Sequence, residues 1–229
     1  MDYRDFVAGE AARRRYWTRS FIGWPRFGQA RPNPAHEALA RLEQRGRLSI
    51  TVTQNVDGLQ QRAGSRQVVE LHGSLAQVVC LSCEDRMPRA EFQQLLLERN
   101  AWLSDLEGEL APDGDARVAA GHEEHLDVPA CGRCGGVMKP DVVFFGESVP
   151  PPRVQSCRQA LAASDAVLIA GSSLMVYSGF RFVREASALG LPVAAVNLGK
   201  TRADNLLQHK FEADCAEVLP PVADLLAPR

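Results

Sequence analysis

The chain has 229 residues, of which 45% are hydrophobic and 24% charged, and its formal net charge is −2. This length suffices for one large domain or two small ones. The near-balance of charge argues against direct binding of nucleic acid, which a basic excess would favour, and no apolar run reaches the roughly 18 residues that span a bilayer. The first residues, MDYRDFVAGE, resemble neither a secretory signal nor a transit peptide. We therefore expect a soluble, cytoplasmic protein of bacterial type without a membrane partner.

The first 47 residues are predicted to be mainly helical. A helix is expected over residues 3–22, followed by a loop rich in proline, glycine and arginine over residues 23–32. Asn33 is suited to cap a second helix, which Pro34 opens and Gly46 ends.

Two apolar stretches with strand character follow the second helix. The stretch LSITVT, residues 48–53, leads into the polar loop TQNVDG, and VVELHG contains His72 near its end. From Ser74 to Met138 the composition changes, because this segment carries four cysteines, several acidic residues and the loop APDGD. We interpret residues 74–138 as an inserted module.

Strands and helices alternate after residue 138. The expected elements are the strand DVVFFGE, the helix VQSCRQALAAS, the strand DAVLIAGSS, the helix GFRFVREASALG and the strand LPVAAVNLG. This alternation predicts parallel βαβ units with both faces of the sheet covered. We therefore predict an α/β fold, in which residues 1–73 and 139–229 form a Rossmann-like domain around a parallel sheet and residues 74–138 form a small inserted module that carries the cysteines.

The four cysteines of the module form two C-x-x-C pairs, Cys80 with Cys83 and Cys131 with Cys134. Two residues between cysteines allow both thiolates of a turn to bind one ion, and two such turns complete a tetrahedral zinc site. An iron–sulfur site and a redox pair are the alternatives. Four protein ligands leave no open position on zinc, so the predicted ion is a single, structural Zn²⁺.

His72 is then not required as a metal ligand and is available for chemistry. It lies where the apolar stretch meets the cysteine module, and Gly73 allows a close approach of another chain segment or a ligand. Imidazole is the side chain best matched to proton transfer near neutral pH. A structural role for this histidine is the alternative.

Three small polar loops, TQNVDG, GSS and NLG, each follow a predicted strand. In parallel sheets, ligands bind at the loops after the carboxyl ends of the strands. The amides, hydroxyls and carboxylate in these loops suit a ribose, a carboxamide or a phosphate. Ordinary turns are the alternative for each loop taken alone.

Taken together, TQNVDGL, ELHG, the two C-x-x-C pairs, KPDVVFFGE, GSSLMV and VNLG resemble the sirtuins, which are NAD-dependent protein lysine deacylases. The resemblance extends from about Asn33 to Pro220, with several specific motifs in the order of the family. The APDGD loop, the wide gap between the cysteine pairs, VYSGFRF and RRRYW are most similar to the class II branch.

The resemblance implies that the domain formed by residues 1–73 and 139–229 binds NAD and that residues 74–138 are a zinc-binding module. It also implies a role for each motif. His72 matches the general base that acts on a ribose hydroxyl of NAD. The positions that match the NAD-binding loops are Gln54, Asn55, Val56, Asp57, Gly171, Ser172, Ser173, Asn197, Leu198, Gly199 and Cys215. The positions that match the strand pairing with the substrate backbone are Val143, Phe144, Phe145 and Gly146.

The implied reaction consumes NAD⁺ as a co-substrate, removes the acyl group from a lysine of a protein or peptide, and gives the free lysine, nicotinamide and O-acyl-ADP-ribose. The family also has a first strand, a GAG-S loop and a GIPDFR-like segment that this sequence does not show. Two alternatives stay open, the first because of this missing segment and the second because it would use the same pocket. One is a truncated, non-catalytic, zinc-stapled protein, and the other is a mono-ADP-ribosyltransferase.

Overall fold

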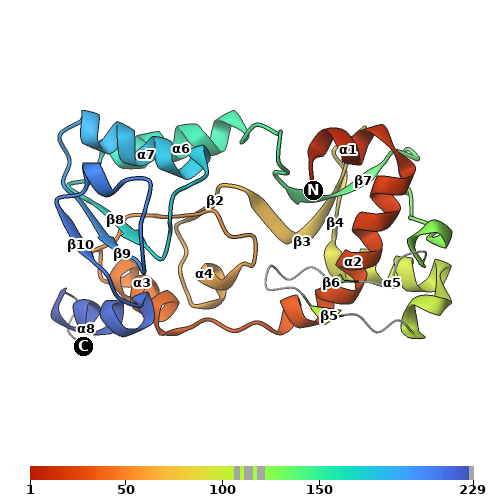
Figure 1. The fold of residues 1–229 in the computed structure, drawn as a ribbon, viewed down its shortest axis with the longest axis horizontal. Helices are drawn as coiled ribbons and strands as arrows, with labels where there is room; N and C mark the ends of the chain where they lie inside the picture. Colours follow the sequence, from red (N-terminus) through yellow and green to blue (C-terminus); the bar gives the residue numbers. More distant parts are fainter. Residues whose placement is uncertain (106–108, 111–115, 118–121, 227–229) are drawn as a thin grey trace. The chain divides into compact units, whose positions relative to one another are not determined.

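The computed structural model describes residues 1–105, 109–110, 116–117 and 122–226 (Figure 1). The chain divides into two compact units. Unit 1 comprises Met1–Ala30 and His72–Ser148, and unit 2 comprises Arg31–Leu71 and Val149–Arg229. Each unit contains its own clusters of buried apolar side chains, so each is described by itself below.

Unit 2 is built on parallel strands. β1 (Thr51–Thr53) pairs with β2 (Val68–Glu70), while β9 (Val193–Val196) pairs with β8 (Val167–Ala170) and β10 (His209–Phe211). All of these pairings are parallel, and over the described residues they form two sheets with the strand orders β1-β2 and β10-β9-β8. The prediction of a parallel α/β fold is confirmed.

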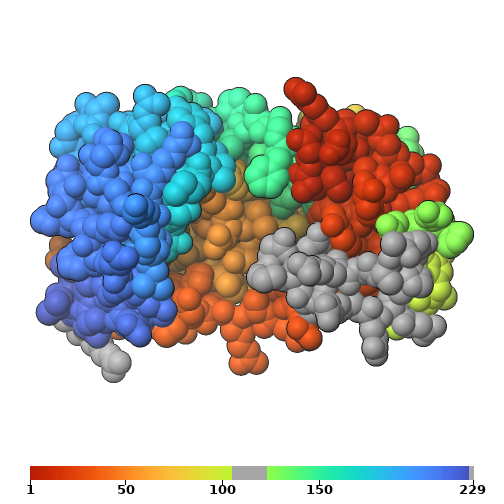
Figure 2. All heavy atoms as spheres, in the orientation of Figure 1, coloured from red at the N-terminus to blue at the C-terminus, as the bar shows by residue number. Residues whose placement is uncertain are grey.

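Helices cover both faces of the β8–β10 sheet (Figure 1). α3 (Pro34–Gln44) and α8 (Cys215–Leu226) pack on one face with Val196, whereas α6 (Pro151–Ala162) and α7 (Tyr177–Ala188) pack on the other with Val193 and Ala195. Successive residues of a strand point to opposite faces, so this one strand supplies both cores. Figure 2 shows the cyan and blue atoms of the C-terminal part of unit 2 packed against one another.

The boundaries of α3 follow from its capping residues. The Asn33 side chain accepts hydrogen bonds from the backbone N–H groups of Ala35 and His36, at 3.0 and 3.2 Å. Gly46, just after the helix, has a φ of +69°, a left-handed conformation that glycine adopts without a steric penalty. The predicted start and end of this helix are therefore confirmed.

Unit 1 contains a small antiparallel sheet packed against helices. β3 (Gly73–Cys80) pairs with β4 (Arg86–Pro88) on one side and with β7 (Met138–Val142) on the other. The helices of this unit are α1 (Tyr3–Ala8), α2 (Glu10–Gln29) and α5 (Arg89–Arg99).

The shorter elements of the two units are α4 (Leu59–Arg62), β5 (Glu109–Leu110), β6 (Ala116–Arg117) and the 3₁₀ helices η1 (Ala101–Asp105), η2 (His122–His125) and η3 (Asp204–Leu206).

A buried arginine joins α2 to α5 in the core of unit 1. The guanidinium of Arg89 lies 5.3 Å from the ring of Trp17 and 5.0 Å from that of Trp24, and it donates to Ser20. Burial lowers the pKa of Arg89 to about 10, so the side chain keeps its charge at neutral pH. Contacts of this kind between a cation and two aromatic faces strengthen as water is excluded.

This packing explains why the predicted loop over residues 23–32 is wrong. α2 continues to Gln29 with Pro25 inside it. An interior proline costs a helix about 3 kcal/mol, but the stacking of Trp24 on Arg89 and the burial of Trp17 hold the segment in the helix. Residues 1–30 also pack in unit 1 with the cysteine module.

Two predicted strands differ from the observed ones. The strand expected over 48–53 is restricted to β1. The strand expected over DVVFFGE is displaced toward the N-terminus, because β7 begins at Met138 and ends at Val142. The APDGD loop lies outside the described residues. No helix among the described residues combines the length and the apolar character needed to cross a bilayer.

Candidate functional site

The four cysteines of the two C-x-x-C pairs converge in unit 1. Their sulfur atoms all lie within 4.8 Å of one another, with 3.5 Å between Cys80 Sγ and Cys134 Sγ and 3.7 Å between Cys83 Sγ and Cys131 Sγ. Zinc–sulfur bonds of about 2.3 Å in a tetrahedron place neighbouring sulfurs about 3.8 Å apart. The cluster therefore fits one zinc ion with a closed, structural coordination shell.

The protonation of these thiols is also suited to a metal. Burial raises the pKa of Cys80, but backbone hydrogen bonds from Cys83 and Ser82 outweigh it and bring the pKa to about 6. Hydrogen bonding with Cys83 raises the pKa of Cys134 to about 12. Neighbouring thiols that share protons titrate in this divided way, and zinc replaces such protons when it binds thiolates.

His72 lies outside the cysteine cluster, directly before β3. Among the described residues, the group of side chains arranged to hold a metal contains the four cysteines and no histidine. The half-buried His72 is fixed through its backbone, since its carbonyl accepts a hydrogen bond of 2.8 Å from the N–H of Val143. The geometry thus leaves the imidazole outside the zinc shell.

Gly73 permits this arrangement. A Cβ atom at this position would lie 2.0 Å from the carbonyl oxygen of Asp141, and the φ of Gly73 is +84°. β7 therefore approaches the backbone next to His72 more closely than any side chain would allow.

We expect Gly73→Ala to lower the free energy of unfolding by roughly 3 kcal/mol or more, because it adds both a backbone clash and left-handed strain. Urea unfolding of the variant measures the loss. Gly9→Ala is the matched control, because nothing lies within 4 Å of its added Cβ. Equal midpoints for Gly73→Ala and the wild-type protein would contradict the close approach.

The predicted substrate-pairing segment is an extended chain that leaves β7. Phe144 is buried and Phe145 is 72% exposed, so successive side chains point to opposite sides. The backbone of Phe145 bonds the first residues of the chain: its N–H donates to Met1 and its carbonyl accepts from Tyr3. The Phe144 N–H donates to the Glu147 carboxylate at 2.6 Å.

A buried ion pair stabilises this segment. The Lys139 ammonium, on a side chain 5% exposed, lies 2.9 Å from Glu147 Oε2 and 4.5 Å from the centre of the Phe144 ring. It also donates to the carbonyl of Val142. The pair therefore ties the turn at Glu147 to the end of β7.

Glu147→Gln is expected to destabilise the protein by about 2–3 kcal/mol, since it leaves a buried ammonium without its counter-charge. Thermal and chemical unfolding measure this effect. Glu185→Gln, which breaks the exposed pair with Arg158, should cost less than about 1 kcal/mol. Similar losses of stability in the two variants would show that the buried Lys139–Glu147 pair stabilises the protein no more than the exposed Arg158–Glu185 pair does.

Unit 2 contains a cavity of about 460 Å³ between β1 and β8. This volume falls within the range of small-molecule sites, roughly 300–1,000 Å³. Thr51 Oγ1 and Gln60 Oε1 belong to residues lining it and are buried without a hydrogen-bond partner in the described structure. Polar atoms in this state favour a ligand that bonds them.

The structure gathers part of the predicted NAD-binding set around this cavity. Its lining includes Gln54, Asn55, Gly171, Ser172 and Cys215. The lining does not include Val56, Asp57, Ser173, Asn197, Leu198 or Gly199. The Asp57 carboxylate instead accepts a hydrogen bond of 3.0 Å from the N–H of Leu59, the first residue of α4.

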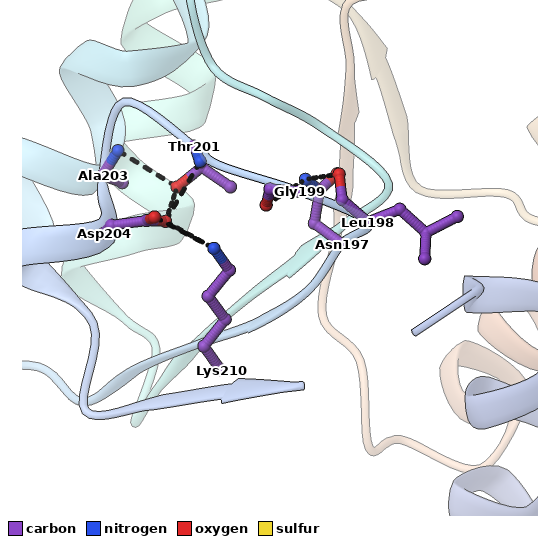
Figure 3. Close-up of polar contacts among 7 residues, drawn as sticks. All are labelled: Asn197, Leu198, Gly199, Thr201, Ala203, Asp204 and Lys210. Carbon is purple, nitrogen blue, oxygen red and sulfur yellow. Dashed lines mark hydrogen bonds and ion pairs between the residues drawn. The ribbon is translucent and has the colours of Figure 1, made fainter. Parts of the chain in front are cut away.

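The loop after β9 is held by its own polar groups (Figure 3). The buried Asn197 side chain donates to the carbonyls of Leu198 and Gly199, at 2.8 and 3.3 Å. Further along the same loop, Asp204 accepts from the Thr201 hydroxyl at 2.6 Å and from Lys210 at 2.9 Å. Hydrogen bonding to Thr201 and Lys210 lowers the pKa of Asp204, so this carboxylate is charged at neutral pH.

Three residues that support the cavity were missed in the sequence. His36 lines it, and burial lowers the pKa of this imidazole, although Asp57 opposes the shift. Ser178 accepts a hydrogen bond from Gln54 at 3.2 Å, and a Cβ at Gly179 would lie 2.6 Å from Gln54 Oε1. Ser178 and Gly179 form the Ser-Gly dipeptide of the motif VYSGFRF. The motif does not reveal their contact with Gln54, because Ser178 and Gln54 are 124 residues apart in the sequence.

The predicted residues thus divide between the two units. His72, the zinc cysteines and residues 143–146 belong to unit 1, and the NAD-binding loops belong to unit 2. A parallel α/β unit with polar loops at the strand ends, together with a four-cysteine metal site, defines a dinucleotide-binding class of protein with a zinc module.

Comparison with known proteins identifies the family: the Sir2 family model matches residues 2–178, and the chain belongs to this family. It is 57% identical over 219 residues to an NAD-dependent protein deacetylase of Xanthomonas campestris pv. campestris, covering 96% of this chain and 75% of the relative. It is 47% identical to the NAD-dependent protein deacylase Sirt4 of Drosophila melanogaster, covering 98% and 72%.

Solved structures agree with this assignment. A Sir2 structure with a p53 peptide and NAD⁺ has a TM-score of 0.79 and 28% sequence identity, and the match covers 98% of this chain and 81% of that one. The resemblance to the sirtuins that the motifs indicate is confirmed.

Proposed function

We propose that this chain is an NAD-dependent protein lysine deacylase. It removes the acyl group from a lysine side chain of a protein or peptide, consumes NAD⁺ as a co-substrate, and yields nicotinamide and O-acyl-ADP-ribose. Membership of the Sir2 family over residues 2–178 is the observation that carries the proposal. The deacetylase and deacylase names of the relatives support it.

The cavity in unit 2 supports NAD⁺ as the co-substrate. The amides of Gln54 and Asn55 at one strand end, and Gly171 with Ser172 at another, offer donors and acceptors to a ribose or a carboxamide. Gly171 has a φ of +60°, and a Cβ there would lie 3.4 Å from Cys215 Sγ. A larger residue at this position would therefore combine left-handed strain with a close contact to Cys215, another residue that lines the cavity.

His72 is the proposed general base, which takes the proton of a ribose hydroxyl. Imidazole is the side chain best matched to proton transfer near neutral pH, and the four cysteines complete the zinc shell without it. The segment Val143–Gly146 is proposed to pair with the substrate backbone, with zinc maintaining the fold of unit 1. The net charge of −2 supports a peptide, and not a nucleic acid, as the partner. A cytoplasmic location stays a prediction.

Incubation with an acetyl-lysine peptide and NAD⁺ tests the proposal. We expect one nicotinamide released per peptide deacetylated, measured by chromatography and mass spectrometry. Nicotinamide release with ADP-ribose attached to a protein acceptor would instead favour mono-ADP-ribosyl transfer. No turnover and no NAD⁺ binding at millimolar concentration would favour a non-catalytic protein.

A further inference from the structure

Leu174 has a backbone conformation that is unfavourable for leucine. Its φ is +56°, and Leu174 and Glu84 are the residues other than glycine with a positive φ in the described structure. Leu174 is also buried, with 7% of its surface exposed, and lines the cavity of unit 2. A β-carbon clashes with the backbone in this region, so surrounding contacts must impose the conformation.

Arg202 makes contacts on both sides of Leu174. Its backbone N–H donates to the carbonyl of Ser173 at 2.8 Å, and its Nη1 donates to the carbonyl of Met175 at 2.9 Å. The two acceptors flank Leu174 in the chain. The guanidinium is further held 4.6 Å from the ring centre of Phe180.

Arg202 is itself fixed by the network in Figure 3. Thr201, the residue before it, donates to Asp204 from both its N–H and its hydroxyl, at 3.1 and 2.6 Å. The Thr201 hydroxyl accepts from the N–H of Ala203, the residue after it, at 3.2 Å. The backbone of Arg202 is thus held between two bonded neighbours, and its position does not depend on the side chain.

We infer that Arg202 is a positioning residue for the co-substrate: its side chain holds Leu174 in the left-handed conformation and thereby shapes the Gly171–Ser173 loop for NAD⁺. The Leu174 N–H also donates to Ser172 Oγ at 3.3 Å, so a change at Leu174 alters the orientation of a cavity-lining hydroxyl. Arg202 acts through the loop and not on the reacting atoms. The inference rests on the proposed function.

Arg202→Ala tests the role of the side chain. We expect the Kd and KM for NAD⁺ to rise about tenfold, while kcat at saturating NAD⁺ changes less than about twofold, because only the binding loop is altered. Arg202→Lys, which keeps a donor, should recover most of the affinity. Arg181→Ala is the matched control: both guanidinium groups lie over the Tyr177 ring, at 5.4 Å for Arg181 and 5.8 Å for Arg202, but within the described structure only Arg202 is seen to bond the carbonyl of Met175.

A double-mutant cycle separates positioning from general packing. In a Leu174→Gly background the left-handed conformation needs no support, so Arg202→Ala should change the Kd less than about threefold there. An equal effect of Arg202→Ala in both backgrounds, or no effect in either, would overturn the inference.

Hydrogen exchange keeps this inference distinct from the proposed function. If the wild-type protein binds no NAD⁺, the proposed function fails, and the exchange of the Ser173, Leu174 and Met175 amides still decides the role of Arg202. Faster exchange of these amides in Arg202→Ala, with the rest of unit 2 unchanged, supports the positioning role. Unchanged exchange in that variant contradicts it.

Discussion

His72→Ala is expected to lower kcat for deacylation by roughly 10²- to 10⁴-fold, the usual contribution of a general base. The zinc content and the thermal stability should stay close to those of the wild-type protein, because the imidazole lies outside the cysteine cluster. The KM for NAD⁺ should change little, since the proposed role concerns a proton transfer and not the binding of the dinucleotide. Steady-state kinetics with an acetyl-lysine peptide and metal analysis of the same preparations measure these quantities.

His209→Ala is the matched control, because this exposed histidine lies on β10 and is not one of the predicted site residues. It should retain the wild-type rate. Equal rates for His72→Ala and the wild-type protein would remove His72 from the mechanism. A loss of zinc in His72→Ala would show instead that the histidine supports the metal site.

Loss of the zinc ion is expected to unfold unit 1. The buried Cys131 and Cys80 belong both to the metal cluster and to the apolar core of this unit, next to Trp17 and Phe92. Structural zinc sites contribute about 10–16 kcal/mol of apparent binding free energy in small domains. Cys131→Ser should therefore abolish stoichiometric zinc and lower the Tm by about 10 °C or more, as several kcal/mol imply for a chain of this size.

The metal content per chain and the unfolding temperature, both under reducing conditions, test this expectation. Cys157→Ser is the matched control, because Cys157 is buried outside the cluster and burial raises the pKa of its thiol to about 11. It should retain one zinc per chain. A Cys131→Ser protein with one zinc and an unchanged Tm would refute the four-cysteine site.

Local signals made a large part of the fold predictable. Asn33 and Gly46 define α3 because capping depends on residues adjacent in sequence. The spacing of Cys80 with Cys83 and of Cys131 with Cys134 likewise encodes a turn and a ligand set together. The motif TQNVDG identified part of the lining of the cavity, through Gln54 and Asn55.

Features set by distant residues were not predictable in this way. The continuation of α2 through Pro25 depends on Arg89, which lies more than sixty positions away in the printed sequence. The left-handed conformation of Leu174 depends on Arg202. A propensity scale assigns proline to loops and a positive φ to glycine, so tertiary contacts that override these preferences remain invisible in the sequence.

The position of Trp17 and Trp24 in the core around Arg89 has a spectroscopic consequence, because it places these fluorescent side chains in unit 1. The chain has three tryptophans, and Trp17, Trp24 and Trp102 all belong to unit 1. Intrinsic indole fluorescence therefore observes only the zinc-containing half of the chain, whereas far-ultraviolet circular dichroism averages over both. Recording the two signals during one denaturation separates the melting of the metal-containing unit from that of the dinucleotide-binding unit without any added label.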